Sequence, residues 1–266
     1  MTLTPIAGAA ADAPAAGPDP AAMNSVLGKA KLILEAFTAA DDALSLTDLV
    51  RRTGVAKATV HRLAQELLTW GVLERVDSGY RLGLRLFEIG QRVPRQRILR
   101  EAALPYMEDL LMATQETIHV AVHDGLDVLY IEKIIMHRGL SGQSRVAGRL
   151  PLYCTATGKV ILALSPPSLF LEVVRAGLTP LTRHTITSPA LLADQLERVR
   201  SQQLATEHEE TRLGYASMAV PVYGGSGVLV AAVSITAPTA RINVPRLSGL
   251  LRAAGVGITR TLRALG

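Results

Sequence analysis

The sequence predicts an α+β protein in which a small helical domain precedes a larger domain built on a mainly antiparallel sheet. Apolar residues recur at helical spacing early in the chain, whereas alternating strand patterns begin at Thr117. Between the two patterns lies an apolar helical stretch punctuated by Pro94 and Pro105, which indicates a linker helix. We therefore expect a disordered tail at 1–24, a helical domain at 25–84, the linker helix at 85–104 and the larger domain at 105–266.

Composition excludes several classes of protein. Hydrophobic residues make up 48% of the 266 and charged residues 19%, which is typical of a globular chain, and no apolar run approaches the roughly 20 residues of a membrane helix. Cys154 is the single cysteine, which excludes an internal disulfide and favours a reducing cytoplasm. Residues 1–24 are rich in Ala and Pro and hold no Lys or Arg, whereas a signal peptide needs a basic start. We expect a cytoplasmic protein without membrane contact.

The first domain opens with two helices whose ends are marked. SVLGKAKLILEAF predicts a helix with Ser25 as its N-cap and an inward face of Val26, Ala30, Ile33, Leu34 and Phe37. In SLTDLVRRTG, Ser45 and Asp48 have the spacing of a capping box. Gly54 permits the positive φ that ends this second helix, and a third helix is expected to begin near Lys57.

The third helix carries two different faces. Val60, Leu63, Ala64 and Leu67 fall at i, i+3, i+4 and i+7 and form one apolar stripe. The opposite face is small, polar and cationic. Two helices joined by a tight glycine turn, the second with such a face, are typical of a helix-turn-helix. Small side chains let the helix backbone approach the floor of a DNA major groove, which is about 12 Å wide.

A β-hairpin follows the third helix and completes a winged helix-turn-helix. GVLERVDSGYRLG gives two short strands around an Asp-Ser-Gly turn, with an arginine on each arm. Residues 25–100 hold 13 Lys and Arg against 8 Asp and Glu, so the basic excess is densest here, although a solvated face would also explain it. A domain that bound protein instead would more often show aromatic anchors outside. The predicted DNA-binding residues are Thr47, Lys57, Ala58, Thr59, His61, Arg62, Gln65, Arg75 and Arg81.

The segment LSLTDLVRRTGVAKATVHRLAQELLTWGVLERVDSGYRLGLRLFEIG resembles the N-terminal domain of the IclR family of bacterial transcriptional regulators. That family shows a Leu-Thr-x-x-Leu-Ala-x-x-Thr-Gly-Leu-x-Lys-Ser-Thr-Val-x-Arg-Leu pattern followed by a Tyr-Arg-Leu-Gly wing. This chain departs from it at Val50, Val55 and Ala58, where Ala, Leu and Ser are usual. The change at Ala58 removes a hydroxyl that could contact DNA and leaves the fold unaffected.

The second domain alternates strands and helices. TIHVAVHDGLDVLYIEKI predicts two strands joined by Asp-Gly, and RLPLYCTATGKVILALSP predicts an extended segment that turns into a helix near Ala156. Helices are expected at 168–176 and 189–202, followed by strands in LATEHEE, YASMAVPVY and VLVAAVSITA. An amphipathic helix at 245–265 ends the chain.

Some residues could support catalysis or metal binding, but a structural role explains each of them more simply. Cys154 with His119 or His123 could form a nucleophile and base, but a lone cysteine beside an apolar run is more often inert. His119 and His123 share a strand face at roughly 13 Å, too far apart for one ion, and Glu207–Glu210 offers carboxylates or merely a charged rim. We expect no enzyme, no bound metal and no cofactor.

The resemblance to the IclR family continues through this domain. GRLPLYCTATGKVILA matches the family's Leu-Pro…Gly-Lys segment, and TEHEETRLGYASMAVPVYGGSGVLVAAVSITAPTARI matches its acidic stretch and Ser-x-Ser/Thr-x-Pro-x-x-Arg ending. The resemblance implies a GAF-like effector-binding domain that also serves oligomerisation. It departs at Glu207, where Asp is usual, and at Tyr215, where an aliphatic residue can stand. The implied effector-binding residues are Ala156, Thr157, Glu207, Tyr215, Ser217, Ser234 and Thr236.

The expected function follows from both halves. The resemblance implies a transcriptional regulator, more often a repressor than an activator, that binds a double-stranded DNA operator as a homodimer or tetramer. A small organic acid or aromatic acid is the expected effector, because N–H groups at the helix start near Thr157 suit a carboxylate. Two alternatives stay open: a metal-binding or catalytic module tethered to DNA, and a DNA-binding protein that responds to no effector.

Overall fold

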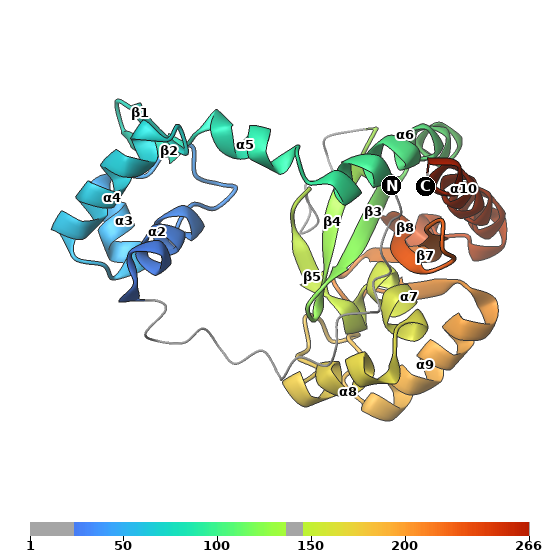
Figure 1. The fold of residues 1–266 in the computed structure, drawn as a ribbon. Coiled ribbons are helices and arrows are strands. Elements are labelled where there is room, and N and C mark those ends of the chain that lie inside the picture. Colours follow the sequence, from blue (N-terminus) through green and yellow to red (C-terminus); the bar gives the residue numbers. More distant parts are fainter. Residues whose placement is uncertain (1–23, 137–145, 266) are drawn as a thin grey trace. The chain divides into compact units, whose positions relative to one another are not determined.

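The computed structural model describes residues 24–136 and 146–265 (Figure 1). These residues divide into two compact units, one ending at Pro94 and the other beginning at Arg95. The tail expected at 1–24 lies, apart from Asn24, outside the described residues. None of the described helices is long and apolar enough to cross a membrane.

The first unit is a winged helix-turn-helix. Three helices pack around a core that includes Ile33, Leu49 and Val60, and the third presents its apolar stripe inward. The predicted hairpin follows, and Asp77 and Ser78 form its turn. The elements are α2 (Val26–Glu35), α3 (Leu46–Thr53), α4 (Lys57–Thr69), β1 (Leu73–Val76), β2 (Gly79–Leu82) and α5 (Leu84–Gly90).

The predicted helix ends are confirmed. Ser45 Oγ accepts from the Asp48 N–H at 3.1 Å and the Asp48 carboxylate accepts from the Ser45 N–H, so the capping box is complete. Gly54 has φ +67° at the end of α3.

The inward position predicted for Val26 is wrong: this side chain is 55% exposed, because the first turn of α2 extends beyond the core that Ile33 enters.

The wing is fixed to the helices by backbone hydrogen bonds. The Leu44 N–H donates to the Tyr80 carbonyl at 2.8 Å, and the Tyr80 N–H donates to the Leu44 carbonyl at 2.9 Å. This close approach requires glycine at position 79, where φ is +143° and a Cβ atom would lie 2.2 Å from the Leu44 oxygen. The wing therefore has a defined position relative to α3 and α4.

Two helices stand where one linker helix was expected at 85–104. The first, α5, ends at Gly90, and the second, α6, runs from Pro94 to Thr114. Pro94 occupies the start of α6, where no N–H donor is needed. Pro105 does not end the helix, because Ala103 and Met107 on either side are fully buried in the core of the second unit and hold that turn in place.

The second unit has three layers, and its α+β class with an antiparallel sheet is confirmed. All strand pairs in the described sheet are antiparallel, in the order β5-β4-β3-β8-β7-β6. Figure 1 shows α6 and α10 on one face and α7 to α9 on the other. Its elements are β3 (Thr117–Asp124), β4 (Asp127–Ile134), β5 (Arg149–Pro151), α7 (Ala156–Leu164), α8 (Pro167–Ala176), α9 (Pro189–Gln202), β6 (Ala205–His208), β7 (Tyr215–Tyr223), β8 (Leu229–Pro238) and α10 (Val244–Leu265).

The two faces of this sheet differ in chemistry. Toward α6 and α10, the central strands present large apolar side chains such as Val120, Met218 and Ile235. Toward α7 they present Ala121, Ala219 and Ala232, all fully buried, which let the helix pack closely. At one end of this second face, serine and threonine replace alanine. The closely packed helix and the polar end of the sheet together frame a pocket.

The start of α7 gives the first prediction. A Cβ atom on Gly158 would lie 2.2 Å from the Leu152 carbonyl oxygen, so Gly158→Ala forces the helix away from the preceding turn. We expect the free energy of unfolding of this unit to fall by about 2 kcal/mol or more, measured by calorimetry.

Gly249→Ala is the matched control. Gly249 lies in α10 with open space around it, so alanine should leave stability unchanged or raise it by up to about 1 kcal/mol. Equal stability of the two variants would contradict a tight α7 start.

Candidate functional site

The outer face of α4 is open to solvent. Val60, Leu63, Ala64 and Leu67 are buried, as predicted, and turn the helix so that its polar face points outward. Thr59 on that face is half-buried, and the other predicted positions are exposed. Thr47 is exposed on α3. The structure thus places every predicted DNA-contact residue on one small unit, at Thr47, Lys57, Ala58, Thr59, His61, Arg62, Gln65, Arg75 and Arg81.

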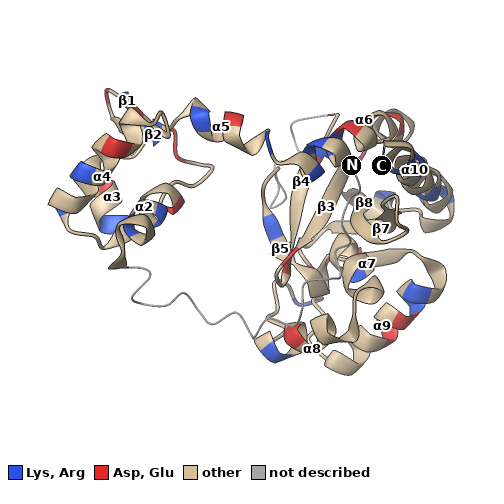
Figure 2. Ribbon diagram, viewed as in Figure 1, with Lys and Arg blue, Asp and Glu red and all other residues tan. Residues whose placement is uncertain are grey.

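Charges on this unit are partly paired (Figure 2). Arg62 forms an ion pair with Glu66 one turn later in α4. Lys57 forms no ion pair with any described carboxylate, and the start of α4 adds the partial positive charge of a helix N-terminus. Lys57 and the first turn of α4 are therefore available to a phosphate or a base edge.

The wing arginines are held by neighbours in the same hairpin. Arg75 stacks on Tyr80 with its guanidinium carbon 4.7 Å from the ring centroid. Arg81 pairs with Glu74 at 2.6 Å, and the same pairing lowers the pKa of the Glu74 carboxyl. A phosphate that bound Arg81 would compete with Glu74.

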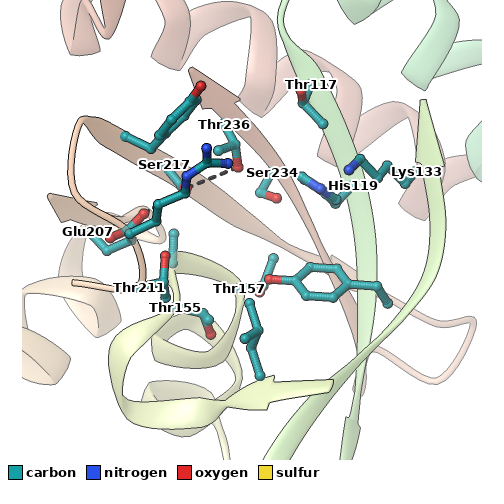
Figure 3. A pocket seen from close by; sticks show the side chains of 15 residues that line it. Thr117, His119, Lys133, Thr155, Thr157, Glu207, Thr211, Ser217, Ser234 and Thr236 are labelled. Carbon is teal, nitrogen blue, oxygen red and sulfur yellow. Dashed lines mark hydrogen bonds between the residues drawn. The ribbon is translucent and has the colours of Figure 1, made fainter. Parts of the chain in front are cut away.

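The second unit contains a pocket between the sheet, the start of α7 and residues 211–215 (Figure 3). Strand register explains its floor. Glu207 pairs with Ser217, Ser217 with Thr236, and Thr236 with Thr117, so four strands contribute one polar row. The next row on the same face begins at Ser234. Polar residues distant in sequence therefore meet in one place.

The first row is connected by hydrogen bonds. Ser217 Oγ donates to Glu207 Oε1 at 2.8 Å and lies 3.0 Å from Thr236 Oγ1. The other carboxyl oxygen, Glu207 Oε2, accepts from the Glu210 N–H at 3.0 Å. Both oxygens of this buried carboxyl thus have a fixed direction, and the group faces the pocket with a defined orientation.

The second row crosses to the far side of the pocket. Ser234 pairs with His119, and His119 pairs with Lys133. A β-bulge inserts Ile131 into β4 opposite Val120 and Ala121, so that Lys133 and Tyr130, three residues apart, both line the pocket. Burial first, and the nearby Lys133 second, lower the pKa of His119 to about 3, so the imidazole is neutral at physiological pH.

The start of α7 forms the roof with unused donors. Thr155 Oγ1 caps the helix by accepting from the Gly158 N–H at 3.0 Å. The N–H groups of Ala156 and Thr157, at the first two helical positions, have no carbonyl partner within the helix. Thr157 is 2% exposed, and its hydroxyl has no hydrogen-bond partner of good geometry in the described chain. These groups suit an anion in the pocket.

Two acidic residues beside the pocket are buried. Burial raises the pKa of Glu207 to about 7, against the opposing effect of the Ser217 hydrogen bond. Burial likewise raises the pKa of Glu210, which forms an ion pair with the fully buried Lys159. Lys159 Nζ also donates to Gln195 Oε1 at 2.7 Å. Lys159 therefore connects α7 to α9 through Gln195, and to the segment that carries Glu207 through Glu210.

Arg212 lies at the exposed side of the pocket. Its guanidinium carbon stacks 4.4 Å above the ring of Tyr215, which occupies the position where the resemblance implied an aliphatic residue. The ring therefore supports a cation at the pocket. All seven implied effector-binding residues line the same pocket: Ala156, Thr157, Glu207, Tyr215, Ser217, Ser234 and Thr236.

The other candidate chemistries find little support. Cys154 is fully buried, and burial raises the pKa of its thiol to about 12, which opposes thiolate formation. In the described ranges 24–136 and 146–265, no group of three or more His, Cys, Asp or Glu side chains could hold a metal ion. His123 hydrogen-bonds the Gly125 carbonyl near the hairpin turn, away from His119.

Sequence reasoning missed half of the pocket. The lining residues that were not predicted as effector contacts are Thr117, His119, Tyr130, Lys133, Leu150, Thr155, Thr211 and Arg212. The alternation of β3 places Thr117 and His119 on one face and was available as a signal. Lys133 was not predictable from alternation, because the bulge shifts the face of β4.

Comparison with known proteins agrees with this arrangement. Residues 26–77 match the IclR helix-turn-helix domain, and residues 91–260 match the bacterial transcriptional regulator IclR C-terminal domain. The chain is 36% identical over 231 residues to the HTH-type transcriptional regulator KdgR of Escherichia coli, covering 86% of this chain and 87% of KdgR. It is 30% identical to the DNA-binding transcriptional repressor YiaJ of Escherichia coli, covering 83% and 80%.

A solved structure is also similar. The IclR homolog of Microbacterium hydrocarbonoxydans, in complex with 4-hydroxybenzoate, has a TM-score of 0.86 and 32% identity, covering 90% of this chain and all of that one. The winged helix-turn-helix, the domain with a pocket and these matches together identify a DNA-binding transcriptional regulator. The chain belongs to the IclR family.

The raised pKa of Glu207 gives a second prediction. Between pH 5 and 7 the folded protein keeps a proton on Glu207 that the unfolded chain loses, so Glu207 contributes a fall in the free energy of unfolding as pH rises, opposite in sign to the contribution of His119, whose pKa is lowered. The fall is at most about 3 kcal/mol from this group. Glu207→Gln should remove this falling contribution, so the slope of the free energy of unfolding against pH should be more positive than in the wild type, measured by denaturant unfolding at each pH. Glu197→Gln, at an exposed pair with Arg200, should retain the wild-type profile. Equal slopes for all three proteins would contradict the raised pKa.

Proposed function

We propose that this regulator represses transcription by binding an operator through α4 and the wing, and that an acid bound in the pocket controls the binding. The pocket supports the proposal most strongly, because donors at the start of α7 face a space lined mostly by hydroxyl groups. Repression is favoured by the similarity to a protein named as a repressor.

The effector we propose is a small organic or aromatic acid. The N–H groups of Ala156 and Thr157 and the Thr157 hydroxyl would donate hydrogen bonds to a carboxylate. Hydroxyl groups on β7 and β8 would form hydrogen bonds with the rest of the molecule, at Ser217, Ser234 and Thr236. The similar regulator that binds 4-hydroxybenzoate supports an acid of this size. A hydroxyl on the ligand would complete the hydrogen bonds of Glu207.

We further propose that the working form is a homodimer or a tetramer. Large apolar side chains around α5 are exposed, including Leu84 at 67%, Phe87 at 63% and Trp70 at 59%. An apolar surface of this kind favours a second protein chain over water. A twofold dimer would present two α4 helices to a pseudo-palindromic operator.

The first experiment measures both activities with one assay. Fluorescence anisotropy of the full chain is recorded on the fragment upstream of its own gene and on a scrambled fragment, at two salt concentrations. We expect specific binding tighter by about 10³-fold, with a steep loss at high salt. Addition of candidate acids then tests release. Equal affinity for both fragments would argue against an operator at that position, and affinity that ignores every acid would contradict the effector.

The third prediction concerns Lys57. Lys57→Met should weaken operator binding about tenfold and reduce the slope of log affinity against log salt by about one, because one phosphate contact is lost. Lys31→Met is the matched control, since Lys31 lies exposed on α2 and pairs with Glu35. The same loss in both variants would show a general charge effect and remove Lys57 from the interface.

A further inference from the structure

Two buried hydroxyl groups in the pocket form no hydrogen bond with the described chain. Thr117 is 4% exposed and Ser234 is 3% exposed, and both line the pocket (Figure 3). Neither side chain is hydrogen-bonded to a group of residues 24–136 or 146–265. A buried hydroxyl without a partner is costly in free energy, so such groups in folded proteins bind another polar group or a water molecule. The two hydroxyls therefore need a partner that the described chain does not supply.

Strand register places these two hydroxyls next to each other. Thr117, the first residue of β3, pairs with Thr236 on β8, and Ser234 pairs with His119. Thr117 and Ser234 are therefore diagonal neighbours on one face of the sheet, a position in which Cβ atoms lie about 7 Å apart. Since an O–H···O hydrogen bond is about 2.8 Å long, one oxygen atom between the two side chains can bond to both.

The neighbouring hydroxyls on the same face are already engaged. Ser217 has one proton and donates it to Glu207 Oε1 at 2.8 Å. The 3.0 Å contact between Ser217 Oγ and Thr236 Oγ1 must then use the proton of Thr236. This row of hydrogen bonds runs toward β6, and it leaves Thr117 and Ser234 with their donors and acceptors unused.

A hydroxyl group is the ligand chemistry that matches this pair. It has one donor and two acceptor lone pairs, so it can accept from one side chain and donate to the other. An alkyl group in the same place would displace water and leave both hydroxyls without a hydrogen bond, which lowers affinity. Figure 3 shows Thr157, at the carboxylate site proposed for the start of α7, across the pocket from Thr117. The carboxylate and the hydroxyl of one ligand would therefore bind at different ends of the pocket.

We propose that the effector is a hydroxy acid, whose carboxylate binds at the start of α7 and whose hydroxyl group binds between Thr117 and Ser234, so that these two residues select hydroxylated acids. The proposal rests on the acid-binding pocket proposed above, and it adds the place of the hydroxyl group and Thr117 as a residue that determines specificity. Both oxygens of Glu207 already accept a hydrogen bond, so the unpaired hydroxyls of Thr117 and Ser234 gain more from the ligand.

The test compares matched acids of three shapes by isothermal titration calorimetry on the full chain. The pairs are 3-hydroxybutyrate and butyrate, gluconate and hexanoate, and 4-hydroxybenzoate and benzoate. We expect at least one hydroxylated acid to bind about 10-fold to 100-fold tighter than its partner, because the unsubstituted acid leaves buried hydroxyls unpaired. The double variant Thr117→Val with Ser234→Ala should reduce that ratio to about one, without weakening the binding of the unsubstituted acid.

Two further variants identify the cause. Thr117→Ser keeps the hydroxyl group and should preserve the preference, which also shows that the position tolerates substitution. Thr206→Val is the matched control, since Thr206 lies on β6 one residue before Glu207 and its side chain points to the other face of the sheet. This variant should keep the wild-type ratio. Circular dichroism of each variant confirms that it is folded.

The outcomes separate this proposal from the broader one. If unsubstituted acids bind as tightly as hydroxylated ones, or if the double variant keeps the preference, the hydroxyl site is wrong while an acid effector stands. If none of the six acids binds, and none releases the operator, both the acid effector and the hydroxy acid are overturned. A preference that disappears in the double variant and persists in Thr117→Ser and Thr206→Val supports the proposal.

Discussion

The register of β8 against its two neighbours is the constraint on which the second unit depends. Pairing of Thr236 with both Ser217 and Thr117, and of Ser234 with His119, gathers hydroxyl groups from three strands on the face toward α7. A shift of β8 by one residue would move Ser234 and Thr236 into the apolar layer under α6 and α10 and bring Val233 and Ile235 to the pocket. Both the apolar core and the polar lining of the pocket therefore depend on the same pairing.

A buried ion pair fixes the helical side of the same pocket. Lys159 on α7 pairs with Glu210, and the Glu210 N–H fixes the Glu207 carboxyl at the pocket. Removal of either member of the pair would leave a charge inside the protein without a partner, which costs several kcal/mol. The pair therefore couples the position of α7, whose first N–H groups face the pocket, to the segment that carries Glu207.

The features that depend on residues close together in the sequence could be predicted from the sequence alone. The capping box at Ser45, the positive φ at Gly54 and the alternation in β3 depend on neighbours in sequence, and they fold as predicted. The position of Lys133 could not be predicted, since a bulge reflects the fit between whole strands. The continuation of α6 through Pro105 likewise depends on tertiary burial that outweighs the missing hydrogen bond.

The ion pairs beside the face proposed to bind DNA have a consequence for how such a regulator would search a chromosome. Glu66 and Glu74 pair with Arg62 and Arg81 in the structure, and the DNA binding proposed above would place both acids near phosphates. A random duplex offers little in return for breaking these pairs, whereas a matching site offers base contacts as well. We expect short residence on unrelated DNA and rapid scanning, with the arginines engaged fully at the operator alone. In the proposed mode of binding, two acidic side chains would in this way limit the time spent on each unrelated site.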